Sequence, residues 1–113
     1  MSVNINIVTF AGNLTRDPES RDVGQSSVVG FTLANTRKFK SGNETKEETA
    51  FVDVEAWGKT ADLVQQYLTK GQPALVEGRL KQEQWQDKDG NKRYTTEIKG
   101  DKIVLLGGGG GGG

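Results

Sequence analysis

The stretch from Ala74 to Ile98, ALVEGRLKQEQWQDKDGNKRYTTEI, is predicted to form a long two-stranded hairpin, and it decides how the rest of the chain is interpreted. Its centre, DKDGN at 87–91, is typical of a turn, because glycine and asparagine tolerate positive φ and aspartate can hydrogen-bond its own backbone. The segments on either side alternate between apolar and polar residues, as expected of strands that bury one face.

The first arm of this hairpin has two distinct faces if it is one regular strand, because side chains two positions apart point the same way. One face carries Ala74, Val76 and Leu80, and the other carries Arg79, Lys81 and Trp85. We therefore expect the apolar set to pack inward and the cations and tryptophan to point outward. A solvent-facing tryptophan favours a partner that covers it.

Composition limits the function classes. The chain has 113 residues, which fits one domain, and 33% of them are hydrophobic. Cysteine is absent, so neither disulfides nor thiolate metal sites can form, and histidine, the commonest general base, is absent as well. The sequence predicts no cofactor and no metal site.

Neither a bilayer-spanning run nor a signal-peptide pattern is present, so a cytoplasmic location without membrane association is expected. Basic and acidic residues number 15 each, which argues against a strongly basic nucleic-acid binder but allows a local positive patch. One such patch, RKFK at 37–40, places three cations around Phe39.

Short runs rich in β-branched and apolar residues predict further strands. These are Val3–Ala11, Val28–Thr36, Thr49–Trp57 and, after the hairpin, Lys102–Leu106. Gly12–Val23 is predicted to be a loop because Asp17-Pro18 marks a turn, and Arg37–Glu48 is predicted to be a charged connection.

The third predicted strand also has two faces. Ala50, Val52, Val54 and Ala56 share one, and Phe51, Asp53, Glu55 and Trp57 share the other. Either tryptophan could be an ordinary core residue, but both share a face with charged residues, which favours exposure. Phe51 would turn inward if the strand carried a bulge.

One helix is predicted, over Thr60–Lys70. Thr60 is a suitable N-cap, Gly71 suits the position after the helix, and Pro73 prevents continuation. The apolar stripe of this helix is Leu63, Val64, Tyr67 and Leu68.

Three strands, a helix and two strands in this order are typical of an all-β OB-fold, a five-stranded Greek-key barrel that binds oligonucleotides or oligosaccharides. The helix would lie between the third and fourth strands, and the long hairpin would join the fourth and fifth. Residues 1–106 are predicted to form this domain, and the seven glycines at 107–113 to form a flexible tail.

Several motifs in the same order resemble the bacterial-type single-stranded DNA-binding protein (SSB) family. They are GNL at 12–14 with DPE at 17–19, FTLA at 31–34, WGK at 57–59, YLTKG at 67–71, VEGRL at 76–80, and Trp85 followed by RYTTE at 93–97. The resemblance covers about residues 3–106. It implies an OB-fold that usually assembles as a homotetramer and binds single-stranded DNA without reading its sequence.

The resemblance places the stacking aromatics of the family at Phe39, Phe51, Trp57 and Trp85, and cations of its DNA path at Lys59, Lys70 and Lys81. The charge pattern adds Lys38, Lys40 and Arg79. Asp53, Glu83 and Gln84 stand where the family usually has cations. The family also recruits replication and repair proteins through an acidic C-terminal tip, and the chain stops in glycine without one.

Other functions are weighed on the same residues. GKT at 58–60 is like the end of a P-loop, but Asp53 occupies the place of the first glycine, and its carboxylate would repel phosphate. DKDG at 87–90 lacks the spacing of a calcium loop. Asp53 and Glu55 on one face could belong to a metal-dependent nuclease, although no further convergent carboxylate is evident.

The leading hypothesis is a single-stranded DNA-binding module that serves replication, recombination and repair and is not an enzyme. The second is an OB-fold protein-interaction module of the primosome-accessory type.

Overall fold

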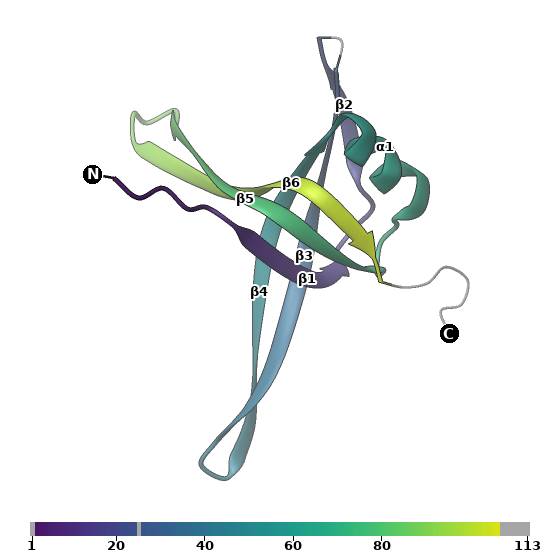
Figure 1. Ribbon diagram of the computed structural model, residues 1–113. Helices are drawn as coiled ribbons and strands as arrows, with labels where there is room; N and C mark the ends of the chain where they lie inside the picture. Colours follow the sequence, from purple (N-terminus) through teal and green to yellow (C-terminus); the bar gives the residue numbers. More distant parts are fainter. Residues whose placement is uncertain (1, 25, 107–113) are drawn as a thin grey trace.

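The computed structural model describes residues 2–24 and 26–106, so the glycine tail predicted at 107–113 lies outside the described residues. The elements in chain order are β1 (Val8–Leu14), β2 (Glu19–Val23), β3 (Ser26–Ser41), β4 (Glu44–Trp57), α1 (Gly58–Tyr67), β5 (Pro73–Gln86) and β6 (Lys92–Leu105) (Figure 1). In the described part of the chain, no helix has the length and apolar character needed to cross a membrane.

Five of the strands close into a barrel in the order β1-β5-β6-β4-β3, because β1 pairs with both β5 and β3. The β4–β6 pairing is parallel, and the other pairings are antiparallel. The helix lies between β4 and β5 along the chain, which are the third and fourth strands of the barrel. The predicted OB-fold and its long final hairpin are confirmed.

One additional strand, β2, forms within the predicted loop Gly12–Val23. It pairs with β3 from Ser26 to Gly30, whereas β1 pairs with β3 at Leu33 and Ala34. The loop prediction was wrong here because β3 is long enough, at 16 residues, to offer pairing partners to two strands in succession.

The predicted connection Arg37–Glu48 is also strand, and it continues the β3–β4 hairpin as far as the pair Ser41 and Glu44. Opposite charges face each other across this extension, with Arg37 opposite Glu48 and Lys38 opposite Glu47. Such pairs stabilise antiparallel strands, so a charged sequence can still extend a sheet.

The bounds of the first and last strands differ from the prediction as well. β1 begins at Val8 and not at Val3, and the predicted strand Lys102–Leu106 is part of β6, continuous with the second arm of the hairpin.

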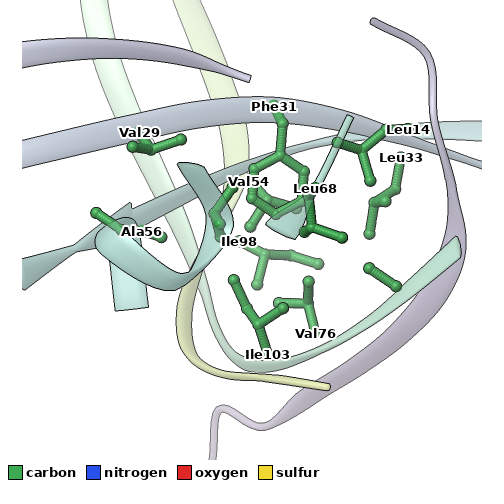
Figure 2. Close-up of a cluster of buried hydrophobic side chains, with 13 residues drawn as sticks. Leu14, Val29, Phe31, Leu33, Val54, Ala56, Leu68, Val76, Ile98 and Ile103 are labelled. Atoms are coloured by element: carbon green, nitrogen blue, oxygen red, sulfur yellow. The ribbon is translucent and has the colours of Figure 1, made fainter. Parts of the chain in front are cut away.

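The hydrophobic core fills the barrel and is covered by α1 (Figure 2). Its strand residues are Leu14, Val29, Phe31, Leu33, Val54, Ala56, Ala74, Val76, Ile98 and Ile103. A register shift in the β5–β6 pairing skips Asp101, so both Ile98 and Ile103 face inward although they are five positions apart.

Leu80 is the exception to the predicted inward face of β5, since it remains 42% exposed. The pairing of β1 with β5 ends at Gly78, and Leu80 lies beyond it on the arm that leaves the barrel. The apolar face of β5 is therefore buried only where the strand is part of the barrel wall.

The helix begins at Gly58 and ends at Tyr67, two to three residues earlier than predicted, and Thr60 does not cap it. Ala61, Val64 and Leu68 form the buried stripe, while Tyr67 is 51% exposed. Gly71 does not follow the helix directly, but it has φ +90° and donates its N–H to the Leu14 carbonyl oxygen at 2.8 Å.

Candidate nucleic-acid interface

The outer face of β4 carries the residues that alternation predicted. Phe51 is 68% exposed, and Trp57 is half-buried at the end of the strand. No inward turn occurs at Phe51, because the pairing of β4 with β3 is regular from Glu44 to Trp57.

Trp57 is the centre of a group of charged side chains. Its indole Nε1–H donates a hydrogen bond to Glu55 Oε1 at 2.7 Å, and Lys99 Nζ lies 5.7 Å from the centroid of its ring. Arg21 Nη2 and Lys81 Nζ lie 3.4 Å and 3.9 Å from the Glu55 carboxylate. The predicted residues Trp57 and Lys81 are thus brought together.

Arg21 and Lys99 belong to this group but were not predicted. Lys99 could have been found by extending the alternation through TEIKG at 96–100, in which Ile98 and Gly100 are buried. Arg21 had no comparable signal, because it lies on β2, which the sequence did not reveal.

Trp85 lies on the β5–β6 hairpin and is 50% exposed. Its Nε1–H donates to Thr95 Oγ1 at 2.9 Å, which holds the ring across the two strands. Arg93, opposite Trp85 in the register, pairs with Asp87 at 2.9 Å. The Asp87 carboxylate also accepts backbone N–H groups from Asp89 and Asn91, so hydrogen bonds hold the pKa of Asp87 below its ordinary value.

Arg79 and Lys81 point outward from β5 as predicted. Arg79 Nε lies 3.4 Å from Asp101, and Lys81 Nζ lies 3.0 Å from Glu83. The hydrogen bond to Glu83 raises the pKa of Lys81, so this ammonium group stays charged at neutral pH.

Acidic groups occupy the middle of the same face. Asp53 lies opposite Glu97 in the β4–β6 pairing and accepts a hydrogen bond from Thr32 Oγ1 at 2.7 Å. Burial, together with the negative charge of Glu55, raises the pKa of Glu97. The face therefore has a carboxylate centre, with cations on either side of it.

The β3–β4 hairpin carries Phe39 with Lys38 and Lys40 on its outer part. Phe39 is half-buried, and the Arg37 guanidinium carbon lies 5.1 Å from its ring centroid. Lys38 Nζ is 3.7 Å from Glu47, and Lys40 is exposed. These residues lie on a strand and not in the loop that was predicted.

The remaining predicted cations lie on α1 and directly after it. Lys59 is in the first turn of α1, and Lys70 follows the helix, with its backbone N–H donating to Asp17 at 2.8 Å. The β3–β4 and β5–β6 hairpins leave the barrel in different directions (Figure 1), so Phe39 and Trp85 lie on separate arms. Within the described ranges, no group of three or more acidic side chains is arranged to hold a metal ion.

Known proteins resemble the chain in both sequence and structure. A sequence model described as "Single-strand binding protein family" matches residues 5–106. The chain is 42% identical to "Single-stranded DNA-binding protein 1" of Chlorobaculum tepidum, with 100% of this chain and 72% of the relative covered. It is 36% identical to "Single-stranded DNA-binding protein" of Treponema pallidum, with 92% of this chain and 59% of the relative covered.

A solved structure described as "Plasmodium falciparum SSB complex with ssDNA" superposes with a TM-score of 0.83 at 25% identity, covering 94% of this chain and 98% of that one. The family match spans the whole barrel, and the resemblance found in the sequence motifs is confirmed. The chain belongs to the single-strand binding protein family.

Proposed function

We propose that residues 1–106 form a domain that binds single-stranded DNA without reading its sequence and that the domain is not an enzyme. Its role would be to protect unwound strands in replication, recombination and repair. This role implies the cytoplasmic location expected from the sequence. The observation that carries the proposal is the set of four aromatic rings that are exposed or half-buried on strands, with cations beside Phe39 and Trp57, in a chain of this family.

The bases would stack on Phe39, Phe51, Trp57 and Trp85. Phe51 and Trp85 are 68% and 50% exposed, so their rings are accessible without any rearrangement. Stacking contributes about 1–3 kcal/mol per base and tolerates any sequence, because every base has a π-face.

The phosphates would follow the cations, which are Lys38, Lys40, Lys59, Lys70, Arg79 and Lys81. Phosphates are disfavoured over Asp53 and Glu97 in the middle of the face, where like charges repel. The strand would therefore cross the middle with its bases toward the protein and its phosphates displaced toward the cations.

Filter binding with three labelled probes tests this proposal: polythymidine, a mixed-sequence single strand and the matching duplex. We expect similar affinity for the two single strands and much weaker binding of the duplex, whose bases are already stacked. Equal affinity for the single strands and the duplex would contradict the proposal.

We also propose that the chain assembles as a homotetramer. Val3, Ile5 and Ile7 are each 75–79% exposed, and Tyr94 is 66% exposed. Large apolar side chains with this much exposed surface favour burial against another subunit. Light scattering at micromolar concentration should give four times the chain mass, and a monomer mass would contradict the assembly.

A protein-interaction module remains the second candidate, and the carboxylates Asp53, Glu55 and Glu97 favour it, since an acidic centre suits a basic protein partner. That function predicts that polythymidine binds weakly even at low salt. The filter-binding experiment therefore separates the two candidates.

A further inference from the structure

Glu55 is buried although it lies on the outer face of β4. It is 7% exposed, and it is the one buried charged residue among those that the structure describes. Burying a carboxylate is costly unless other groups offset its charge and satisfy its oxygens. Oε1 accepts the Trp57 N–H and faces Lys81, while Oε2 faces Arg21.

The hydrogen bond from Trp57 links this carboxylate to a ring proposed to stack with a base. Glu55 and Trp57 are two residues apart on one strand, so their side chains leave the same face side by side. The bond, at 2.7 Å, fixes the direction in which the N–H edge of the indole points, and with it the orientation of the ring plane. Lys99, opposite Glu55 in the β4–β6 register, lies 5.7 Å from the same ring.

We propose that Glu55 is a positioning residue for single-stranded DNA binding that acts through the indole N–H of Trp57. This inference rests on the proposed function. A ring already held in its binding orientation loses less conformational freedom when a base stacks on it, and preorganisation of this kind strengthens binding. Because Arg21 and Lys81 accompany it, the Glu55 carboxylate repels a passing phosphate less than an exposed carboxylate would.

The test compares Glu55→Gln with Glu55→Met. Both variants are neutral and close in size to glutamate, so they change the charge of the face equally. Glutamine keeps an oxygen that can accept the Trp57 N–H, whereas methionine has no comparable acceptor. We expect Glu55→Met to bind polythymidine between about twofold and tenfold more weakly than Glu55→Gln, the range set by one hydrogen bond.

The same two variants are then made in a Trp57→Phe background, which keeps an aromatic ring and removes the N–H. If Glu55 acts through that N–H, the difference between glutamine and methionine disappears. An equal difference in both backgrounds would show that Glu55 acts on the fold and would overturn the proposal. Equal binding of Glu55→Gln and Glu55→Met in the parent chain would overturn it as well.

Glu77 provides the matched control because it is exposed on β5 and lies opposite Thr9 and Lys102 in the strand pairings. Glu77→Gln and Glu77→Met should have equal affinity for polythymidine. If Glu55→Met does not fold, as judged by melting curves, Glu55→Ala takes its place, since it also lacks the acceptor.

A second measurement needs no DNA. The chain has two tryptophans, so Trp85→Phe leaves Trp57 as the sole indole fluorophore. Adding Glu55→Met should lower the fluorescence anisotropy of Trp57 and increase its quenching by acrylamide, whereas Glu55→Gln should change both less. No difference between the two variants would overturn the positioning role. Failure of the parent chain to bind polythymidine would instead overturn the proposed function.

Discussion

Asn6 and Leu80 are joined by two hydrogen bonds in which a side-chain amide takes the place of a strand backbone. Asn6 Nδ2 donates to the Leu80 carbonyl oxygen at 2.8 Å, and the Leu80 N–H donates to Asn6 Oδ1 at 2.7 Å. Backbone pairing between β1 and β5 ends at Val8 and Gly78. The amide continues that pairing and fixes the segment that carries Ile5 and Ile7.

Asn6→Ala should therefore loosen the N-terminal segment. We expect the free energy of unfolding to fall by about 1 kcal/mol, because two exposed hydrogen bonds are lost. Hydrogen exchange should also become faster at the Leu80 amide. Asn4→Ala, at an exposed position on the same segment, is the control. Unchanged exchange at Leu80 in Asn6→Ala would contradict this account of the contact.

Gly78 is required at the register shift where β5 pairs with β6, because a Cβ at this position would overlap the Lys99 carbonyl group. Gly78→Ala should destabilise the fold by about 1–3 kcal/mol, since the backbone must shift to make room. Gly30→Ala is a matched control, because the atom nearest to its added Cβ is the Val54 carbonyl oxygen at 3.9 Å. Chemical denaturation of both variants tests the difference, and equal stability would contradict it.

The carboxylate centre predicts a pH dependence of DNA binding. The pKa of Glu97 is raised above its ordinary value of 4.5, first by burial and then by the charge of Glu55. The folded protein thus holds this proton more tightly than the unfolded chain does, and Glu97 lowers stability above its folded pKa. That cost is lost as pH falls through the folded pKa toward 4.5.

Protonation also removes one negative charge from the proposed DNA-binding face, so affinity for polythymidine should rise as pH falls through the pKa of Glu97. Glu97→Gln should bind more tightly at neutral pH, by less than about 1 kcal/mol, and should lack this part of the pH dependence. Affinities of both proteins between neutral and mildly acidic pH test the prediction. Identical pH profiles would show that Glu97 does not face the DNA.

Glu83→Lys should tighten binding to single strands. Glu83 is paired with Lys81 at 3.0 Å, so the substitution adds a cation and removes one of the two carboxylates beside the Lys81 ammonium group, leaving Glu55. The slope of log affinity against log salt should become steeper, because each phosphate contact contributes about 0.7 on a single strand. An unchanged slope would place the DNA path away from this arm.

Alternation along strands was sufficient to predict much of this molecule. It assigned Val54 and Ala56 to the core, it placed Trp85 outside, and with the helix position it gave the OB topology. It could not show where a strand leaves the barrel. Leu80 therefore has the pattern of a core residue and is 42% exposed.

The contacts around Trp57 could not be predicted from spacing. Glu55 has the parity of an exposed residue, yet it is buried, with Trp57 beside it and with Arg21 and Lys81 approaching it from other strands. Arg21 reaches it from β2, which pairs with an unexpectedly long β3. Side-chain groups assembled from several strands depend on register, which a single sequence does not state.

If bases stack on the β5–β6 hairpin while cations beside them hold phosphates, as proposed, Trp85→Ala and Lys81→Ala should respond differently to salt. Both side chains lie on the outer face of β5, outside the core. Stacking releases no counterions, whereas a lysine that contacts a phosphate does. Trp85→Ala therefore removes a stacking contribution to the binding free energy, and Lys81→Ala removes an electrostatic one.

The most direct measurement is the affinity of the parent chain and both variants for one polythymidine strand across several salt concentrations, with melting curves as the folding control. Trp85→Ala should bind more weakly, by about 1–3 kcal/mol if one base is lost, with a nearly unchanged salt slope. Lys81→Ala should weaken binding more at low salt than at high salt and should make the slope shallower. A folded Trp85→Ala variant that binds as tightly as the parent would contradict the claim and favour the protein-interaction module.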